Sequence, residues 1–198
     1  MEWCAVGLEK DIPPGLVVPS RIDDINLAIW RTTSGALRVF ADRCPHRGMR
    51  LSHGFVRDDK LWCIYHGWRY KKTGVCDYIP AHPSLEPPSS ICVQQYPCKE
   101  QNGVVWASLT PTKHEPPNLT GFSAVRSLEI EVSCKDVAKF FSQPKRKIIY
   151  IGDPGCFAIA LQPTGTDRCV AHLLTTKKAK TASAWIEKKR AQIEGLLQ

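Results

Sequence analysis

Hydrophobic and polar residues alternate over short stretches throughout the first 110 residues of the chain. Alternation with a period of two, bounded by Gly, Pro and Asn, is typical of β-strands. The pattern predicts strands in residues 15–20, 25–32, 36–42, 61–70, 91–100 and 103–110. Ser34-Gly35 and Asn102-Gly103 each lie between two of these runs and predict tight hairpins. Many short strands at regular spacing favour an antiparallel sandwich or a small barrel.

The pattern changes after residues 111–121, where Pro, Asn and Thr cluster. Beyond this point we expect strands in residues 128–132, 147–152, 156–163 and 169–176, with a short helix in residues 134–143. Residues 180–197 predict an amphipathic helix whose apolar face holds Ala182, Trp185, Ile186, Ile193, Leu196 and Leu197. The sequence therefore predicts a mainly β chain of two domains, residues 1–112 and a small α+β unit in residues 122–198.

The composition of the chain is that of a folded protein in a reducing compartment. Hydrophobic residues make up 43% of the 198 positions, enough for a sizeable core. The nine cysteines are scattered along the chain rather than grouped as a small disulfide scaffold. No apolar run has the length of a membrane-spanning helix, and the first residues lack the pattern of a signal peptide. We therefore expect a cytoplasmic protein whose surplus cysteines are reduced.

Two short runs, CPHRG at residues 44–48 and CIYHGW at residues 63–68, carry the candidate chemistry. Each run offers one cysteine and one histidine. A thiolate and an imidazole in each of two loops suit a [2Fe–2S] cluster in which Cys44 and Cys63 bind one iron and His46 and His66 bind the other. Neutral imidazoles in place of two thiolates raise the reduction potential above that of an all-cysteine ferredoxin.

A tetrahedral zinc site is the alternative interpretation of the same four residues, because cysteine and histidine pairs also bind zinc. Common zinc fingers, however, place their cysteines before their histidines, whereas here the two types interleave. Gly48 and Gly67, which follow the histidines, allow the backbone to approach a cluster closely. Residues 79–81 are a candidate third cover of the site. Aromatic residues that could shield the second loop are Trp62, Tyr65, Trp68 and Tyr70.

These motifs resemble the Rieske domain of Rieske non-haem iron oxygenases, the vanillate-demethylase-like enzymes and the alpha subunits of ring-hydroxylating oxygenases. The resemblance covers about residues 3–110 and includes WCAVG, DIPPG, CPHRGMRLSHG, CIYHGWRY and IPA. Respiratory and photosynthetic Rieske proteins carry an additional cysteine after each ligand pair, and here Met49 and Trp68 or their neighbours fill those places. The resemblance implies a Rieske-type antiparallel β-sandwich, a [2Fe–2S] cluster as cofactor, and one-electron transfer.

A complete oxygenase of this family also has a catalytic domain with a mononuclear iron, held by two histidines and a carboxylate. Residues 128–197 resemble only the closing part of the helix-grip fold of that domain, which implies a truncated catalytic domain. The histidines outside the two motifs show no ligand pair at helical spacing: they are His53, His82, His114 and His172. We therefore expect no oxygen-activating site in this chain and assign it no catalytic residue.

Three functions fit this set of residues. The first is an electron-transfer protein related to oxygenase components; the second is a subunit of an oxygenase whose catalytic iron lies on another polypeptide; the third is a redox-sensing or assembly module. Residues 144–198 carry ten Lys and Arg against four Asp and Glu, within a net charge of +8. This basic stretch is either a solvated helix face or a docking surface for an acidic redox partner.

The expected partners follow from these functions. The redox partner is a ferredoxin or a flavin reductase, and the second function adds an oxygenase partner subunit. Self-association into a homo-oligomer is also compatible with the chain. No aromatic-interleaved basic stripe accompanies the charge, so nucleic acid is not an expected partner. A membrane is not expected either, because no apolar run is long enough to span one.

Overall fold

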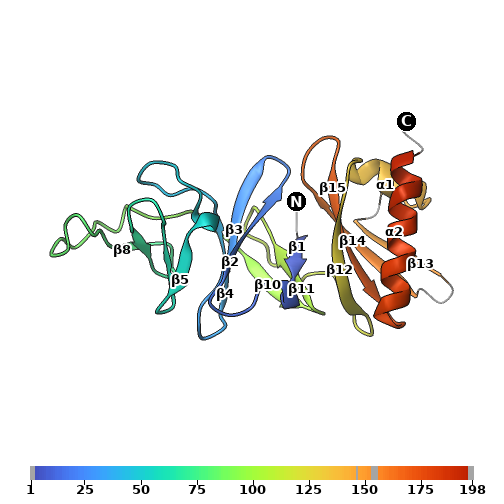
Figure 1. The fold of residues 1–198 in the computed structure, drawn as a ribbon, viewed down its shortest axis with the longest axis horizontal. Helices are drawn as coiled ribbons and strands as arrows, with labels where there is room; N and C mark the ends of the chain where they lie inside the picture. The colour runs from blue at the N-terminus through green and yellow to red at the C-terminus, as the bar shows by residue number, and fades with distance from the viewer. Residues whose placement is uncertain (1–2, 146, 153–155, 196–198) are drawn as a thin grey trace.

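The computed structural model describes residues 3–145, 147–152 and 156–195. The chain is mostly antiparallel β-sheet with two α-helices, as predicted (Figure 1). Within the described residues, no helix has the length and apolar character needed to span a membrane.

Three antiparallel sheets are built before residue 108. The first sheet contains β1 (Cys4–Leu8), β10 (Cys98–Gln101) and β11 (Val104–Ala107). The second contains β2 (Val17–Ile22), β3 (Ile25–Arg31), β4 (Leu37–Ala41) and β9 (Gln95–Tyr96). The third contains β5 (Phe55–Arg57), β6 (Lys60–Trp62), β7 (Arg69–Tyr70) and β8 (Cys76–Tyr78). Two 3-10 turns, η1 (Glu9–Asp11) and η2 (Leu51–His53), connect these strands.

Both predicted hairpins are confirmed. Strands β10 and β11 pair directly, and Asn102 and Gly103 between them have φ angles of +56° and +74°. Two successive positive φ angles are typical of the tight turn that matches the twist of a hairpin. Strands β3 and β4 pair in the same way, with Gly35 at φ +95° in their connection.

Two of the predicted strands are each divided in the structure, so the prediction of single strands was wrong there. In residues 61–70 the backbone leaves β6 after Trp62, forms a tight loop and re-enters the sheet as β7 at Arg69. In residues 91–100 Pro97 separates β9 from β10. Proline has no N–H to give to a sheet ladder, which explains why the chain changes sheets at this residue.

The fourth sheet and both α-helices follow residue 122, close to their predicted positions except that β12 begins five residues before the strand predicted at residues 128–132. The sheet has the order β12 (Ser123–Ile130), β15 (Cys169–Thr175), β14 (Phe157–Pro163) and β13 (Ile148–Ile151), and all neighbours are antiparallel. Helix α1 (Cys134–Phe140) begins after Ser133, whose side chain accepts a hydrogen bond from the Asp136 N–H. This cap satisfies one of the free N–H groups at the start of the helix.

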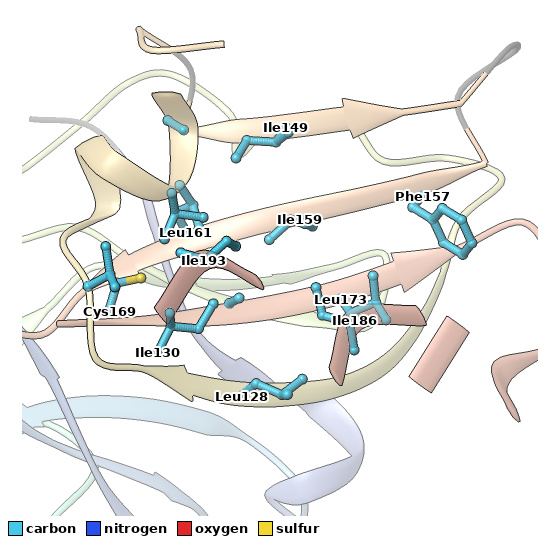
Figure 2. Close-up of a cluster of buried hydrophobic side chains, with 14 of the residues drawn as sticks. Leu128, Ile130, Ile149, Phe157, Ile159, Leu161, Cys169, Leu173, Ile186 and Ile193 are labelled. Atoms are coloured by element: carbon cyan, nitrogen blue, oxygen red, sulfur yellow. The ribbon is translucent and has the colours of Figure 1, made fainter. Parts of the chain in front are cut away.

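Helix α2 (Ala179–Gly195) covers one face of the fourth sheet (Figure 1). As predicted, Ala182, Ile186 and Ile193 are buried, and the Trp185 ring stacks on Phe157 at a centroid distance of 4.4 Å. Figure 2 shows the apolar side chains that fill the space between this sheet and the helices. Leu196 and Leu197, which belong to the predicted apolar face, lie outside the described residues.

The opposite face of the fourth sheet packs against the first sheet. Trp3 and Trp106 from the first sheet region and Leu174 from β15 belong to one buried apolar cluster. The four sheets follow one another along the long axis of the molecule, with β5–β8 at one end and α2 at the other (Figure 1). The loops that carry the two cysteine–histidine runs therefore lie far from the basic C-terminal helix. The division into domains 1–112 and 122–198 stays a prediction.

Candidate metal centre

The two cysteine–histidine runs form loops with the same backbone hydrogen bonds. In each loop the cysteine N–H donates to the carbonyl five residues later, and the cysteine carbonyl accepts from the glycine N–H four residues later. The N···O distances are 2.8 Å for Cys44–Met49, 2.9 Å for Gly48–Cys44, 2.9 Å for Cys63–Trp68 and 3.0 Å for Gly67–Cys63. The matching turns place the two cysteines in equivalent backbone positions.

Glycine is required where each loop closes. Gly48 and Gly67 have φ angles of +75° and +65°, in the left-handed region that penalises a side chain. A Cβ atom on Gly67 would also lie 2.9 Å from Cγ of Pro80. The segment at residues 79–81 therefore lies against the second loop, in the place expected of a third cover.

The two cysteine side chains are buried side by side in one apolar cluster. The backbone N–H groups of Tyr65 and His66 lie close enough to the sulfur of Cys63 to lower its pKa, an effect smaller than that of burial. Burial raises the pKa of Cys63, and the neighbouring Cys44 raises it further. On the other side, the Tyr70 hydroxyl lies 3.0 Å from Sγ of Cys44, and burial followed by this contact raises the pKa of Tyr70.

The two histidine rings face each other across the loops, with centroids 4.7 Å apart. Trp68 stacks on His46 at 4.3 Å with an interplanar angle of 5°, and Tyr65 packs on His66 at 3.8 Å. Burial, followed by the charges of His66 and Arg47, lowers the pKa of His46. This shift favours the neutral imidazole, which is the form that binds metals.

One buried nitrogen atom of the candidate centre has no hydrogen-bond partner. Nδ1 of His46 is buried and has no hydrogen-bond partner. A buried polar nitrogen without a partner is costly in a folded protein, and a metal ion that accepts its lone pair removes that cost. Two buried thiols beside two facing imidazoles, one with an unpartnered nitrogen, fit a [2Fe–2S] cluster of the predicted ligand set.

The donors are arranged as two pairs. Among the described residues, no group of three or more His, Cys, Asp or Glu side chains is placed to hold one metal ion. A cluster with two cysteines on one iron and two histidines on the other needs only two protein donors per iron.

The histidine side of the loops is the exposed side. His46 and His66 are half-buried, whereas Ile64 and Tyr65 beside His66 in the chain are 60% and 54% exposed. Three exposed arginines surround the first loop and form no ion pair within the described part of the chain: Arg43, Arg47 and Arg50.

Several contacts of this region could not be read from the sequence. Trp68, one of the aromatic residues expected to shield the site, does so by stacking on the histidine of the other loop. The Tyr70 hydroxyl contacts a cysteine 26 positions away in the sequence. Trp62 belongs to a separate support, in which the Arg69 guanidinium lies 5.2 Å from the Trp62 ring and pairs with Asp77 at 2.7 Å. The aromatic residues around the second motif were the only signal for these contacts.

Three of the four histidines outside the motifs are exposed and one is buried. His82 and His114 are exposed, and His53 is exposed at the end of η2. His172 on β15 is buried, with Nδ1 2.8 Å from the Ser127 hydroxyl and Nε2 2.9 Å from Oε1 of Gln162.

Comparison with known proteins agrees with this geometry. Residues 2–97 match the family model of the Rieske [2Fe-2S] domain. The chain is 36% identical over 116 residues to oxidoreductase NdmD of Pseudomonas putida, which is 58% of this chain and 20% of that protein. It is 37% identical over 123 residues to chloroplastic protein TIC 55 of Arabidopsis thaliana, which is 61% of this chain and 23% of that protein. It is 39% identical over 111 residues to the 3-chlorobenzoate-3,4-dioxygenase oxygenase subunit of Comamonas testosteroni, which is 54% of this chain and 26% of that subunit. The chain therefore spans about a fifth to a quarter of these relatives.

Solved structures resemble the fold over almost the whole chain. Apo dicamba monooxygenase matches with a TM-score of 0.78 at 16% identity, over 98% of this chain and 85% of that one. A Pseudomonas putida NdmA variant with theobromine also matches with a TM-score of 0.78 at 14% identity, over 97% of this chain and 79% of that one. Motif, geometry and family match together show that residues 2–97 of this chain form a Rieske [2Fe-2S] domain, which implies a [2Fe–2S] cluster as its cofactor.

Proposed function

We propose that this chain is a one-electron carrier that takes an electron from an acidic redox protein and passes it to an oxygenase-type partner. Cys44 and Cys63 hold one iron of the cluster as thiolates, and His46 and His66 hold the other. The observation that carries this assignment is the buried, unpartnered Nδ1 of His46 beside a second histidine and two buried thiols.

When bound, the cluster supplies the one-electron chemistry, and the chain's own residues position it. Trp68 and Tyr65 fix the two imidazole rings by stacking. The N–H groups of Tyr65 and His66 and the Tyr70 hydroxyl direct positive charge at the sulfurs, which favours the more negative, reduced state. The histidine edges lie on the exposed side, where an electron can leave or enter.

The proposed docking surface is the histidine end of the molecule rather than the basic C-terminal helix. Helix α2 lies at the opposite end of the long axis from β5–β8 (Figure 1). Some of its charges are also engaged, because Glu187 pairs with Arg126 at 2.9 Å and with Arg190 at 3.2 Å. The exposed Arg43, Arg47 and Arg50 beside the first loop offer an acidic ferredoxin or flavin reductase a complementary surface.

A charge-reversal pair tests this proposal. We expect Arg47→Glu to slow reduction of the cluster by an acidic reductase, with a smaller salt dependence than the unaltered protein shows, because electrostatic steering acts chiefly on association. The matched control is Lys188→Glu on the exposed part of α2, which should leave the rate within experimental error. Stopped-flow absorbance at several salt concentrations measures both. Slowing by Lys188→Glu but not by Arg47→Glu would contradict docking at the histidine end.

The proposal also holds that the chain has no mononuclear iron site of its own. Both ring nitrogens of His172 are engaged with Ser127 and Gln162, and the other three histidines outside the motifs are exposed. We expect electron uptake but no oxygenation or demethylation by the chain alone, even with ferrous iron, a reductase and NADH. Binding of a third iron coupled to oxygen-dependent product formation contradicts this.

A second candidate is a subunit of an oxygenase whose catalytic iron lies on another polypeptide. The structural match to dicamba monooxygenase over 98% of this chain, including the fourth sheet and α2, favours this candidate. Product formation that requires both this chain and an added second subunit distinguishes it from a simple carrier.

We also propose that residues 1–112 and 122–198 are separate domains. We further propose that the protein is cytoplasmic, because its nine cysteines are free thiols.

A further inference from the structure

Two cysteines outside the candidate metal centre lie together at one end of the fourth sheet. Cys169 is the first residue of β15 and pairs with Ile130 at the end of β12. Helix α1 begins four residues later with Cys134. The turn between β12 and α1 therefore brings Cys134 back over the start of β15. Both cysteines are free thiols.

The two thiols have different environments. Cys169 is 1% exposed and lies within the apolar cluster between sheet and helices (Figure 2). Cys134 is half-buried and packs against that cluster. The neighbouring Cys169 thiol lowers the pKa of Cys134, and the neighbouring Cys134 sulfur, followed by burial, raises the pKa of Cys169. Cys134 is thus the more exposed of the two cysteines and its thiol the more easily deprotonated, whereas Cys169 is shielded from solvent.

We propose that Cys134 and Cys169 form a peroxide-sensitive dithiol that closes reversibly to a disulfide. In the first step the Cys134 thiolate attacks hydrogen peroxide, which gives Cys134 sulfenic acid and hydroxide. In the second step the Cys169 sulfur attacks the sulfenic sulfur, the S–S bond forms and water leaves. The pair loses two electrons and two protons, and one peroxide is reduced to two waters. A dithiol reductant reverses the oxidation by thiol–disulfide exchange.

The disulfide joins the start of α1 to the start of β15 and encloses β13 and β14 in a covalent loop. Such a link restricts the unfolded chain, so the oxidised C-terminal unit should melt at a higher temperature than the reduced one. This inference is independent of the proposed electron-transfer function, because neither cysteine belongs to the candidate ligand set.

Peptide mapping of the holoprotein tests the pair. The protein is treated with a small excess of hydrogen peroxide, alkylated, digested without reductant and analysed by mass spectrometry, while the visible absorbance reports cluster integrity. We expect a cross-linked peptide pair containing Cys134 and Cys169 that disappears on reduction, together with an upward shift in Tm. In Cys169→Ser, Cys134 should stop at the sulfenic acid and be trapped by dimedone. In Cys134→Ser, Cys169 should stay reduced.

Cys92→Ser is the matched control, because Cys92 is an exposed free cysteine elsewhere in the chain. This variant should retain the cross-link in full. Cys4 is the competing partner, since its pKa is raised partly by the charge of Cys134. A Cys4–Cys134 link, overoxidation of Cys134 without a cross-link, or two thiols that both remain open to alkylation would overturn the proposal.

Discussion

Tyr70 shows how one side chain sets the properties of the candidate centre. Its ring is fully buried, and its hydroxyl lies 3.0 Å from Sγ of Cys44. A cysteine that binds iron is a thiolate, so the hydroxyl donates in this contact. The bond strengthens when the cluster gains an electron, because the sulfur then carries more negative charge.

Tyr70→Phe is therefore expected to lower the reduction potential. If the hydrogen bond favours the reduced state by roughly 0.5–1.5 kcal/mol, the one-electron potential falls by roughly 20–65 mV. Redox titration followed by visible absorbance measures the change. Tyr150→Phe on the distant strand β13 is the control and should leave the potential unchanged. An unchanged or higher potential in Tyr70→Phe argues against Cys44 as a ligand.

Gly67 tests the backbone requirement of the second loop. Gly67→Ala places a Cβ in a left-handed conformation, at a cost of roughly 1–2 kcal/mol, and 2.9 Å from Pro80. We expect lower iron content per chain and a lower free energy of unfolding. Gly121→Ala is the matched control, because Gly121 has φ +88° but a Cβ added there would meet nothing within 4 Å. It should share the backbone cost and keep its iron. Full iron content in Gly67→Ala contradicts the close packing of the loop.

At the residue scale the sequence predicted the chemistry but not the contacts. Cysteine and histidine spacing indicated the four candidate ligands, because ligand type and loop glycines are local properties. The stacking of Trp68 on His46 and the bond from Tyr70 to Cys44 depend on how two loops meet in space. No local sequence pattern predicts contacts between residues of two different loops. The ligand assignment itself stays a prediction.

At the scale of elements, the fourth sheet contacts the rest of the molecule through a buried polar network. Gln162 on β14 donates through Nε2 to the Arg21 carbonyl at 2.6 Å, which fixes the orientation of its amide. Its Oε1 then accepts from Nε2–H of His172, and Nδ1 of His172 accepts from the Ser127 hydroxyl. The network therefore holds His172 in its neutral form.

This network predicts a specific pH dependence. Burial lowers the pKa of His172 from 6.5 to about 4. Because the folded-state pKa lies below the unfolded value, the unfolded chain binds more protons between these two pH values. The stabilisation is complete above pH 6.5 and is lost as the pH falls toward about 4, by roughly 3 kcal/mol in total. The groove that includes His172 is also lined by charged side chains of both signs: Asp11, Arg21, Arg50, Glu129, Glu131 and Arg168.

Urea unfolding at pH 7 and at lower pH measures this loss. His172→Gln keeps a donor and an acceptor but cannot be protonated, so it should lose less stability on acidification than the unaltered protein. The exposed His82→Gln is the control and should behave as the unaltered protein does. Equal acid sensitivity in His172→Gln and the unaltered protein would show that another group is responsible.

Elements with a strong local signal were predicted well. The Asn-Gly hairpin, strands β13, β14 and β15 and the amphipathic helix each have a pattern that holds over their whole length, whereas β12 begins five residues before its predicted start. The single strand predicted in residues 61–70 was wrong, because the apolar residues of this run continue through the loop that carries Cys63 and His66. There, apolar side chains serve a metal site rather than a sheet face, and the period-two pattern cannot distinguish the two uses.

At the scale of the whole molecule, the fold separates two ends with different roles. The candidate metal centre lies toward the end formed by β5–β8, and the basic C-terminal helix covers the sheet at the other end (Figure 1). The sequence indicated the net charge but not its distance from the cluster, since distance along the long axis depends on how the four sheets pack. Docking at the histidine end is our proposal, and the interpretation of the basic helix as a docking surface stays an untested alternative.

The central claim is that the two loops hold one [2Fe–2S] cluster through two cysteines and two histidines. Electron paramagnetic resonance of the dithionite-reduced protein, with nitrogen hyperfine spectroscopy and iron and sulfide analysis on the same sample, tests it most directly. We expect two irons and two acid-labile sulfides per chain, and a reduced cluster coupled to two imidazole nitrogens. One tightly bound zinc without labile sulfide, or a reduced cluster without histidine nitrogen coupling, would contradict the account.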